Sequence, residues 1–298
     1  MANLKELRVR IKSVKNTQQV TKAMKMVAAA KLKKAQDRIV QLRPYASKLQ
    51  EIIGNVTAVL DVEEIPSKLV EVRPVENILV VVVTSNRGLA GPFNSNILKH
   101  TVTFLEENHA DDLAAEKVKF MCVGRKGYEY FKARNYPLVG ENHDVFTGLD
   151  FDKVNALTEQ VFDLFLGGEY DKVYLCFNEF KNVMSQIRRA DTFLPVSVEA
   201  NEAPAEETVE LNSDYIFEPG REEILEELIP RALKVQMFRA ILESNAAEHG
   251  ARMVAMDTAT ENAEDLLKDL KLVYNKARQA AITKEILEIS AGADALSN

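Results

Sequence analysis

Residues 251–289 read ARMVAMDTATENAEDLLKDLKLVYNKARQAAITKEILEI and decide the fold of this chain. The stretch contains no Gly and no Pro, so nothing in it breaks a helix. Apolar side chains recur at intervals of three and four residues, which marks one face of a helix. They are Met253, Met256, Ala263, Leu267, Leu270, Tyr274, Ala277 and Ala281. The last turns carry apolar residues on more than one face, so we expect this end to enter an apolar sleeve on another molecule.

Residues 1–60 supply a second helix with a matching pattern. Alternating steps of three and four residues meet apolar side chains along the whole segment, and this sustained 3.5-residue repeat predicts a coiled coil. Three polar residues interrupt the repeat: Gln18, Thr21 and Lys25. Pro44 lies inside the pattern, and we expect it to kink the helix rather than end it, because the repeat resumes at Ala46.

Between the two helices, strand-like and helix-like segments alternate. Residues 77–85 form a continuous β-branched run that is typical of a strand buried on both faces. Further strands are expected at 117–124 and 171–180, and helices at 93–107, 128–135 and 151–166. This order predicts a small, mostly parallel α/β sheet, and the weak alternation of residues 182–199 suggests an antiparallel edge strand.

Neither long helix can bury its apolar stripe alone, so we expect the two to pair antiparallel. The predicted fold class is α/β plus long α, in which a Rossmann-like α/β domain is inserted between two coiled-coil helices. Pro230 and Gly250 are expected to be local weak points of the second helix. The predicted domains are an N-terminal coiled-coil helix (1–60), an α/β domain (75–200), an acidic loop (201–220) and a C-terminal coiled-coil helix (221–290).

The charge of this 298-residue chain is unevenly distributed. Residues 1–60 hold 13 Lys or Arg against 3 Asp or Glu, although the whole chain has a net charge of −7. A strongly cationic helix in an acidic protein indicates an anionic partner, which is either nucleic acid or an acidic protein surface. A lysine-rich face exposed to solvent is the alternative interpretation. The near absence of aromatic residues from this helix counts against nucleic acid. We expect the basic start of the chain to be retained rather than removed as a transit peptide.

The motifs that would indicate an enzyme are missing. The loop SNRGLAGPFN (85–94) follows the first strand, where α/β folds usually bind phosphate, but it lacks the lysine of a P-loop. GRKG (124–127) is a weaker phosphate candidate, and tight turns are the preferred interpretation of both loops. The histidines stand apart, without metal-ligand spacing. Cys122 and Cys176 are expected to be buried thiols. We therefore expect no cofactor, no metal and no catalytic site.

The two ends of the chain together resemble the gamma subunit of the F-type ATP synthase, the central rotor stalk. The resemblance lies in IKSVKNTQQVTKAMKMVAAAKLKKAQ (11–36), in RPYA (43–46) and in the stretch quoted first. The loop TSNRGLAGPFN (84–94) is similar to the family's loop after the first strand. Asn86 and Ala90 stand there where many members carry Asp and Cys.

The resemblance implies a function that composition does not reveal. The paired helices would lie inside a ring of three alpha and three beta subunits, and the α/β domain would be fixed, with epsilon, to a membrane ring of c subunits. Ion flow would turn this rotor and drive ATP synthesis at the beta sites, while this chain performs no chemistry itself. It would lie on the cytoplasmic side of a bacterial plasma membrane, as a peripheral subunit without membrane insertion.

The resemblance also implies contact residues. Met24 and Lys25 match positions near the acidic loops of beta, and Tyr215 matches a position near the c ring. Four residues of the last helix match positions that contact a beta-subunit loop: Arg278, Gln279, Thr283 and Glu285. The alternatives are a basic coiled-coil protein that binds nucleic acid and an α/β enzyme with helical extensions.

Overall fold

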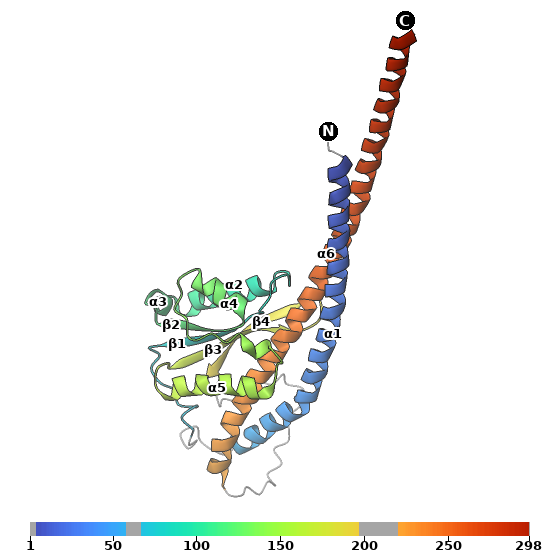
Figure 1. Ribbon diagram of the computed structural model, residues 1–298. Helices are drawn as coiled ribbons and strands as arrows, with labels where there is room; N and C mark the ends of the chain where they lie inside the picture. Colours follow the sequence, from blue (N-terminus) through green and yellow to red (C-terminus); the bar gives the residue numbers. More distant parts are fainter. Residues whose placement is uncertain (1–3, 58–66, 197–219, 298) are drawn as a thin grey trace. The chain divides into compact units, whose positions relative to one another are not determined.

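The computed structural model describes residues 4–57, 67–196 and 220–297 (Figure 1). The elements in chain order are α1 (Leu4–Thr57), β1 (Ile78–Val83), α2 (Phe93–Asn108), α3 (Ala110–Ala114), β2 (Val118–Val123), α4 (Arg125–Lys132), the 3-10 helix η2 (Asp144–Phe146), α5 (Phe151–Leu166), β3 (Lys172–Phe180), β4 (Gln186–Leu194) and α6 (Arg221–Ser297). The chain divides into two compact units. The paired-helix unit contains Met1–Ala29 and Arg252–Asn298, and the α/β unit contains Ala30–Ala251.

A four-stranded sheet of order β2-β1-β3-β4 forms the centre of the α/β unit. β1 pairs in parallel with both β2 and β3, whereas β4 pairs antiparallel with β3 at the edge of the sheet. All six residues of β1 are fully buried, as its unbroken β-branched run ILVVVV predicts. The mostly parallel sheet and the antiparallel edge strand are both confirmed.

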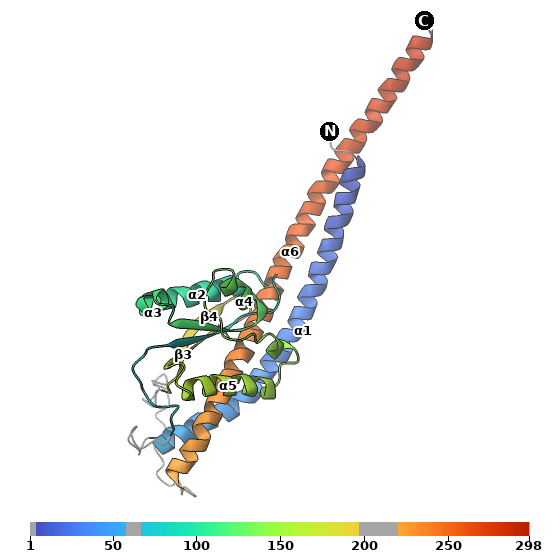
Figure 2. The same cartoon turned by 60° about the vertical axis from the view of Figure 1, so that its left-hand side comes forward.

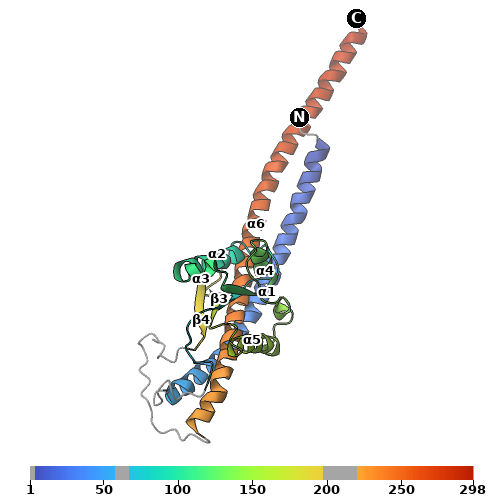
Figure 3. The same ribbon diagram turned by 90° about the vertical axis from the view of Figure 1, so that its left-hand side faces the viewer.

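Helices cover both faces of this sheet (Figure 2). Because successive side chains of a strand point to opposite faces, β1 contributes Ile78, Val80 and Val82 to one face and its alternate residues to the other. The first face packs against α2 and α4. The second packs against α5 and against those parts of α1 and α6 that belong to this unit, as the view along the sheet shows (Figure 3).

The two cysteines lie on the strands that flank β1. Cys122 and Cys176 are each paired in register with Val82, so one whole strand separates them. At about 4.8 Å between neighbouring strands, their Cα atoms are roughly 10 Å apart, beyond the reach of a disulfide. Both are buried free thiols, as expected, and burial raises the pKa of each to about 12.

Both long helices pass through the residues at which a break or a kink was considered. α1 continues through Pro44, as predicted. α6 is likewise continuous through Pro230 and Gly250, where local weak points are predicted. Gly250 serves close packing, because a Cβ at this position would lie 3.3 Å from Cε2 of Phe180 and 3.6 Å from the backbone of Val183.

Two short helical features differ from the expectation. α4 begins at Arg125 rather than three residues later, and α3 has no counterpart in the predicted pattern. The start of α4 is fixed by a distant residue, since the backbone N–H of Arg125 donates to Oδ1 of Asn86 at 3.0 Å. Contacts between residues 39 positions apart are not visible in a local hydrophobic pattern.

Candidate functional site

In the paired-helix unit, the first part of α1 lies antiparallel beside α6, and all three views agree on this (Figures 1 to 3). The buried side chains of the unit all occupy positions of the two predicted stripes: Leu7, Thr21, Ala28, Met256, Ala263, Leu267 and Leu270. Ala28 is 1% exposed, and its small side chain lets the two helices approach closely. The expected antiparallel pairing is therefore present.

Among the polar contacts across this apolar seam are three between side chains of α1 and α6. The hydroxyls of Thr21 and Thr260 are 2.8 Å apart, and Nζ of Lys25 lies 2.5 Å from Oδ1 of Asp257. Nearer the start of α1, the guanidinium of Arg8 donates to the Tyr274 hydroxyl at 3.0 Å and lies 6.0 Å from the ring centre. This hydrogen bond lowers the pKa of Tyr274.

The structure places Met24 and Lys25 next to each other on α1, and both are half-buried. Lys25 does not extend freely toward a partner, because its ammonium group pairs with Asp257 of α6. The side chains of the pair remain 39% and 46% exposed, so a charged group of another molecule can still interact with both of them. Any partner of Lys25 therefore meets an ion pair and not a lone cation.

The four predicted contact residues of the last helix lie together on exposed turns of α6. They are Arg278, Gln279, Thr283 and Glu285. The Thr283 hydroxyl donates to the carbonyl of Gln279 at 2.9 Å, which is a contact within the same helix. Tyr215, the remaining predicted contact, lies outside the described residues.

α6 continues beyond the start of α1 and exposes apolar side chains there (Figure 1). Ile282, Ile286, Leu287 and Ile289 are 48% to 72% exposed. A helix that presents large apolar residues on several faces gains nothing from them while it is surrounded by water. This arrangement fits the expected apolar sleeve on another molecule.

The paired-helix unit keeps the uneven charge seen in the sequence. The α1 part of the described unit carries seven Lys or Arg against one Glu, whereas the α6 part carries six against eight Asp or Glu. One long side of the pair is therefore strongly cationic, which favours an anionic surface opposite α1.

In the α/β unit, the loops at the carboxyl ends of β1 and β2 occupy the usual phosphate position. The free N–H groups at the start of α4 would be the anion donors there. The first three backbone N–H groups of α4 already donate hydrogen bonds to the residues that follow β1. Arg125 N–H donates to Asn86, as described above, Lys126 N–H donates to the Ser85 carbonyl, and Gly127 N–H donates to Oγ1 of Thr84 at 2.9 Å.

The backbone at two glycines of these loops is also packed closely against Thr84. A Cβ on Gly127 would lie 2.9 Å from Oγ1 of Thr84, and a Cβ on Gly124 would lie 2.2 Å from the carbonyl oxygen of Thr84. Gly124 has φ +113°, which only glycine adopts readily. The loops thus pack on each other, as expected for tight turns.

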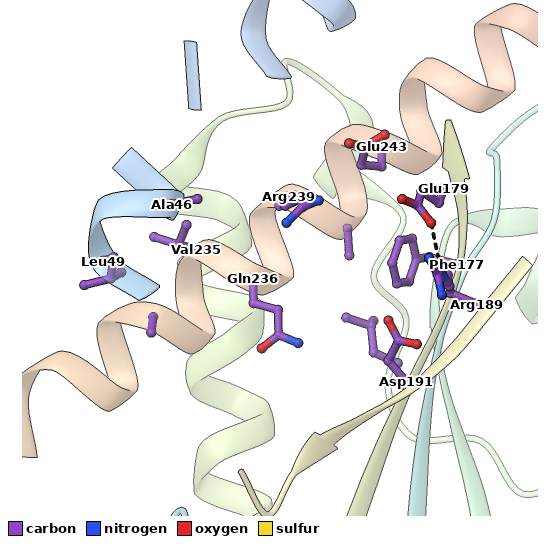
Figure 4. Close-up of a pocket in the computed structure, with 13 residues that line it drawn as sticks. Ala46, Leu49, Phe177, Glu179, Arg189, Asp191, Val235, Gln236, Arg239 and Glu243 are labelled. Carbon is purple, nitrogen blue, oxygen red and sulfur yellow. Dashed lines mark hydrogen bonds and ion pairs between the residues drawn. The ribbon is translucent and has the colours of Figure 1, made fainter. Parts of the chain in front are cut away.

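A pocket of about 380 Å³ lies in the α/β unit between α6, α1 and the edge of the sheet (Figure 4). Its lining mixes apolar side chains such as Leu49 and Phe177 with an ion pair of 2.7 Å between Arg189 and Glu179. Burial raises the pKa of Asp191 and of Glu243, and Glu243 also accepts a hydrogen bond from the backbone N–H of Phe180 at 3.2 Å. Nothing in this mixture of charges specifies one class of ligand.

Two other kinds of site are missing from the described part of the chain. Within residues 4–57, 67–196 and 220–297, no group of three His, Cys, Asp or Glu side chains is placed to hold a metal ion. Over the same ranges, no helix has the length and apolarity needed to cross a membrane.

The polar pairs between the helices were missed in the sequence. Thr21 and Lys25 stood out as interruptions of the heptad, but their partners did not. A signal was present nonetheless. The apolar stripe of α6 has a gap of seven residues between Met256 and Ala263, and Thr260 occupies the skipped position. Two interruptions in matching stripes indicate a polar layer.

Comparison with known proteins identifies the family. The family model described as ATP synthase matches residues 3–296. A relative from Cytophaga hutchinsonii, named ATP synthase gamma chain, is 52% identical over 298 residues and covers 100% of both chains. A protein of the same name from Chloroherpeton thalassium is 48% identical and covers 99% of both chains.

A solved structure shares the fold. The chain matches a subunit in the cryo-EM structure of the Euglena gracilis mitochondrial ATP synthase, OSCP/F1/c-ring, with a TM-score of 0.66. The alignment covers 98% of this chain and 94% of that one at 21% identity. The family model and the full-length identity of about half to the curated relatives lead to one conclusion: this chain belongs to the ATP synthase gamma-chain family.

Proposed function

We propose that this chain is the central rotor stalk of an F-type ATP synthase. It couples ion flow through a membrane ring of c subunits to ATP synthesis or hydrolysis at the beta-subunit sites. The observation that carries the proposal is the full-length match to ATP synthase gamma chains. The exposed apolar end of α6 supports it, because exposed apolar patches of this kind mark sites of contact with another protein.

The mechanism is conformational coupling rather than chemistry by this chain. Each orientation of an asymmetric stalk contacts one beta subunit differently from the other two. Differential contact energy shifts the conformational equilibrium of each beta site, and rotation then moves the sites through successive affinities. The loops at the strand ends support this role, because their donors at the start of α4 bind their own chain.

The partners are three alpha and three beta subunits, the epsilon subunit and the c ring. The cationic side of the paired-helix unit faces acidic loops of beta, with Met24 and Lys25 at that contact. Arg278, Gln279, Thr283 and Glu285 contact a beta-subunit loop further along α6, and Tyr215 lies near the c ring. The chain acts as a peripheral subunit on the cytoplasmic side of a bacterial plasma membrane.

The alternative of a nucleic-acid-binding coiled coil rests on the cationic α1 alone. The family assignment supports the rotor stalk instead. The two functions differ in one simple measurement, since phosphate contacts make nucleic-acid affinity fall steeply with salt concentration. A purified chain that co-isolates with alpha and beta and shows no such salt-dependent DNA affinity supports the stalk.

A pair of alanine variants tests the contact residues. Arg278→Ala and Gln279→Ala change exposed side chains, and alanine keeps the helix, so the stalk should remain folded. We expect ATP hydrolysis by the assembled complex to fall several-fold, or to drive less ion pumping per ATP. Lys271→Ala and Asn275→Ala are matched controls on the same helix. Equal activity in all four variants would refute the assignment of the contact.

A further inference from the structure

Three polar contacts of the paired-helix unit share one register: Thr21 with Thr260, Lys25 with Asp257, and Arg8 with Tyr274. In an antiparallel pair, the numbers of facing residues have a constant sum. The sum is 281 for the first contact and 282 for the other two. Contacts that are several turns apart therefore agree on a single stagger of the helices.

The apolar pattern cannot select this stagger by itself. A heptad repeat returns to the same face every seven residues, so a slip by one heptad again sets apolar against apolar. After such a slip, Ile11 would face Ala277 and Val14 would face Tyr274. Both are acceptable neighbours in a helix seam. Selection between registers must come from residues that do not repeat.

A slip that raises the sum by seven breaks two of the three polar contacts. Lys25 would meet Glu264 and keep an ion pair, so this contact alone does not discriminate. Thr21, however, would face Leu267 and lose its hydroxyl partner. Arg8 would reach Ala281 and lose both the hydrogen bond and the ring of Tyr274.

A slip in the opposite direction fails at every contact. Lys25 would face Gly250, Arg8 would face Leu267 and Thr21 would face Met253 or its neighbour. Such a slip loses the hydrogen bonds that join the two helices, and the threonine hydroxyls keep only the carbonyls of their own helices as acceptors. The observed register is the one in which all three contacts form.

The threonine pair also has a defined proton arrangement. Oγ1 of Thr260 lies 2.6 Å from the Met256 carbonyl, and Oγ1 of Thr21 lies 3.1 Å from the Gln18 carbonyl. Two hydroxyl protons serve three short contacts, so one threonine donates across the seam while the other donates to its own helix. The layer is thus satisfied without water.

We propose that the Thr21–Thr260 and Arg8–Tyr274 contacts, with Lys25–Asp257, set the register of the two helices in the paired-helix unit. The register determines how far α6 extends beyond the start of α1. At a sum of 282, Leu4 at the start of α1 faces Arg278, so the register fixes the residue at which α6 continues without α1. A slip of one heptad would move that point by about 10.5 Å along the helix. The proposal concerns contacts within this chain and holds whether or not the proposed beta contacts are correct.

Disulfide trapping in the full-length chain reads the register directly. Gln18→Cys with Ala263→Cys reports the observed register, and Gln18→Cys with Leu270→Cys reports the slipped one. With the polar contacts intact, we expect only the first pair to cross-link. In a triple variant, Arg8→Leu with Thr21→Val and Thr260→Val, the ratio of the first cross-link to the second should fall by about tenfold. The native thiols do not interfere, since both are buried in the α/β unit.

A matched triple variant serves as the control. Arg10→Leu, Thr17→Val and Thr258→Val make the same changes at exposed positions, and their ratio should equal that of the unchanged chain. The double variant Thr21→Ser with Thr260→Ser, in which Arg8 is unchanged, should also retain the cross-link ratio of the unchanged chain, because serine keeps the hydroxyl.

Two results would overturn the proposal. One is a triple variant that retains its helical circular dichroism and still cross-links only in the observed register. The other is loss of both cross-links with the helices intact, which would mean that the contacts hold the helices together without selecting a register. If the triple variant loses its helical signal, the double variant Arg8→Leu with Thr260→Val is compared by the same criteria.

Discussion

Thr84 closes the position at which an α/β fold usually binds phosphate, and its removal makes a quantitative prediction. Its side chain is 1% exposed, accepts a hydrogen bond from Gly127 N–H at 2.9 Å and donates to the Gly124 carbonyl at 3.3 Å. Thr84→Val keeps the shape and removes both hydrogen bonds. The buried Gly127 N–H is then left without an acceptor.

The expected cost follows from this geometry. A buried donor without a partner costs about 1–3 kcal/mol, and the longer bond to Gly124 adds little. We expect Thr84→Val to lower the free energy of unfolding of the α/β unit by about 2 kcal/mol. With a urea dependence of about 2 kcal/mol per M, the unfolding midpoint moves down by about 1 M.

Thiol labelling of Cys122 during urea unfolding measures this effect in the correct unit, because Cys122 is buried in the neighbouring strand β2. Thr84→Ser retains the hydroxyl and loses one methyl group, so it should cost less than about 1 kcal/mol. A midpoint for Thr84→Val within about 0.2 M of the unchanged chain would refute the reasoning. It would mean that the Gly127 donor finds another acceptor.

Three further predictions concern charges and thiols. Lys25→Glu places a second carboxylate beside that of Asp257, and the two repel each other, so we expect less ion pumping per ATP hydrolysed. Adding Asp257→Lys restores an ion pair with the charges exchanged. If the ion pair itself is what matters, ion pumping per ATP should recover. If pumping stays low, the positive charge of residue 25 acts on another subunit instead. The raised pKa of Glu243 means that its ionisation opposes folding, so its contribution to stability is present at low pH and declines as pH rises through the folded-state pKa. Glu243→Gln should therefore reduce the pH dependence of the urea unfolding midpoint. An unchanged slope of midpoint against pH would contradict this. Cys122 and Cys176, with pKa values of about 12, should react with thiol reagents only after unfolding and form no disulfide under oxidants; rapid labelling of the folded chain would contradict their burial.

Much of the fold follows from periodicity in the sequence. The heptads of α1 and α6, the apolar run of β1 and the weak alternation of β4 each identify an element, because each reflects burial on a known number of faces. The antiparallel pairing of the helices was also predictable, since each has a stripe that only the other can cover.

Contacts between distant residues were not predictable in the same way. A heptad tells which face of α1 is buried but not which residue of α6 lies opposite, so the pairing of Lys25 with Asp257 appears only in the structure. The packing role of Gly250 was not predictable for the same reason. Its neighbours Phe180 and Val183 come from another part of the chain, and local propensity alone marks glycine as a weak point.

The contact residues at the end of α6 belong to a third class. The side chains of Arg278 and Gln279 are exposed in this chain, so neither burial nor a side-chain hydrogen bond distinguishes them from Lys271 or Asn275. Only the family resemblance singles them out. Their role depends on atoms of other subunits, which no pattern within this chain can encode.

The complete burial of β1 has a consequence for hydrogen exchange. Its amides are held between two parallel neighbours and are 0% exposed, so they exchange only when the whole α/β unit opens. The amides of α6 beyond Arg278 are bonded within one exposed helix and exchange through local fraying. A single deuterium experiment on this chain therefore separates two timescales, and protection gained by the second set on assembly would report which turns another subunit has covered.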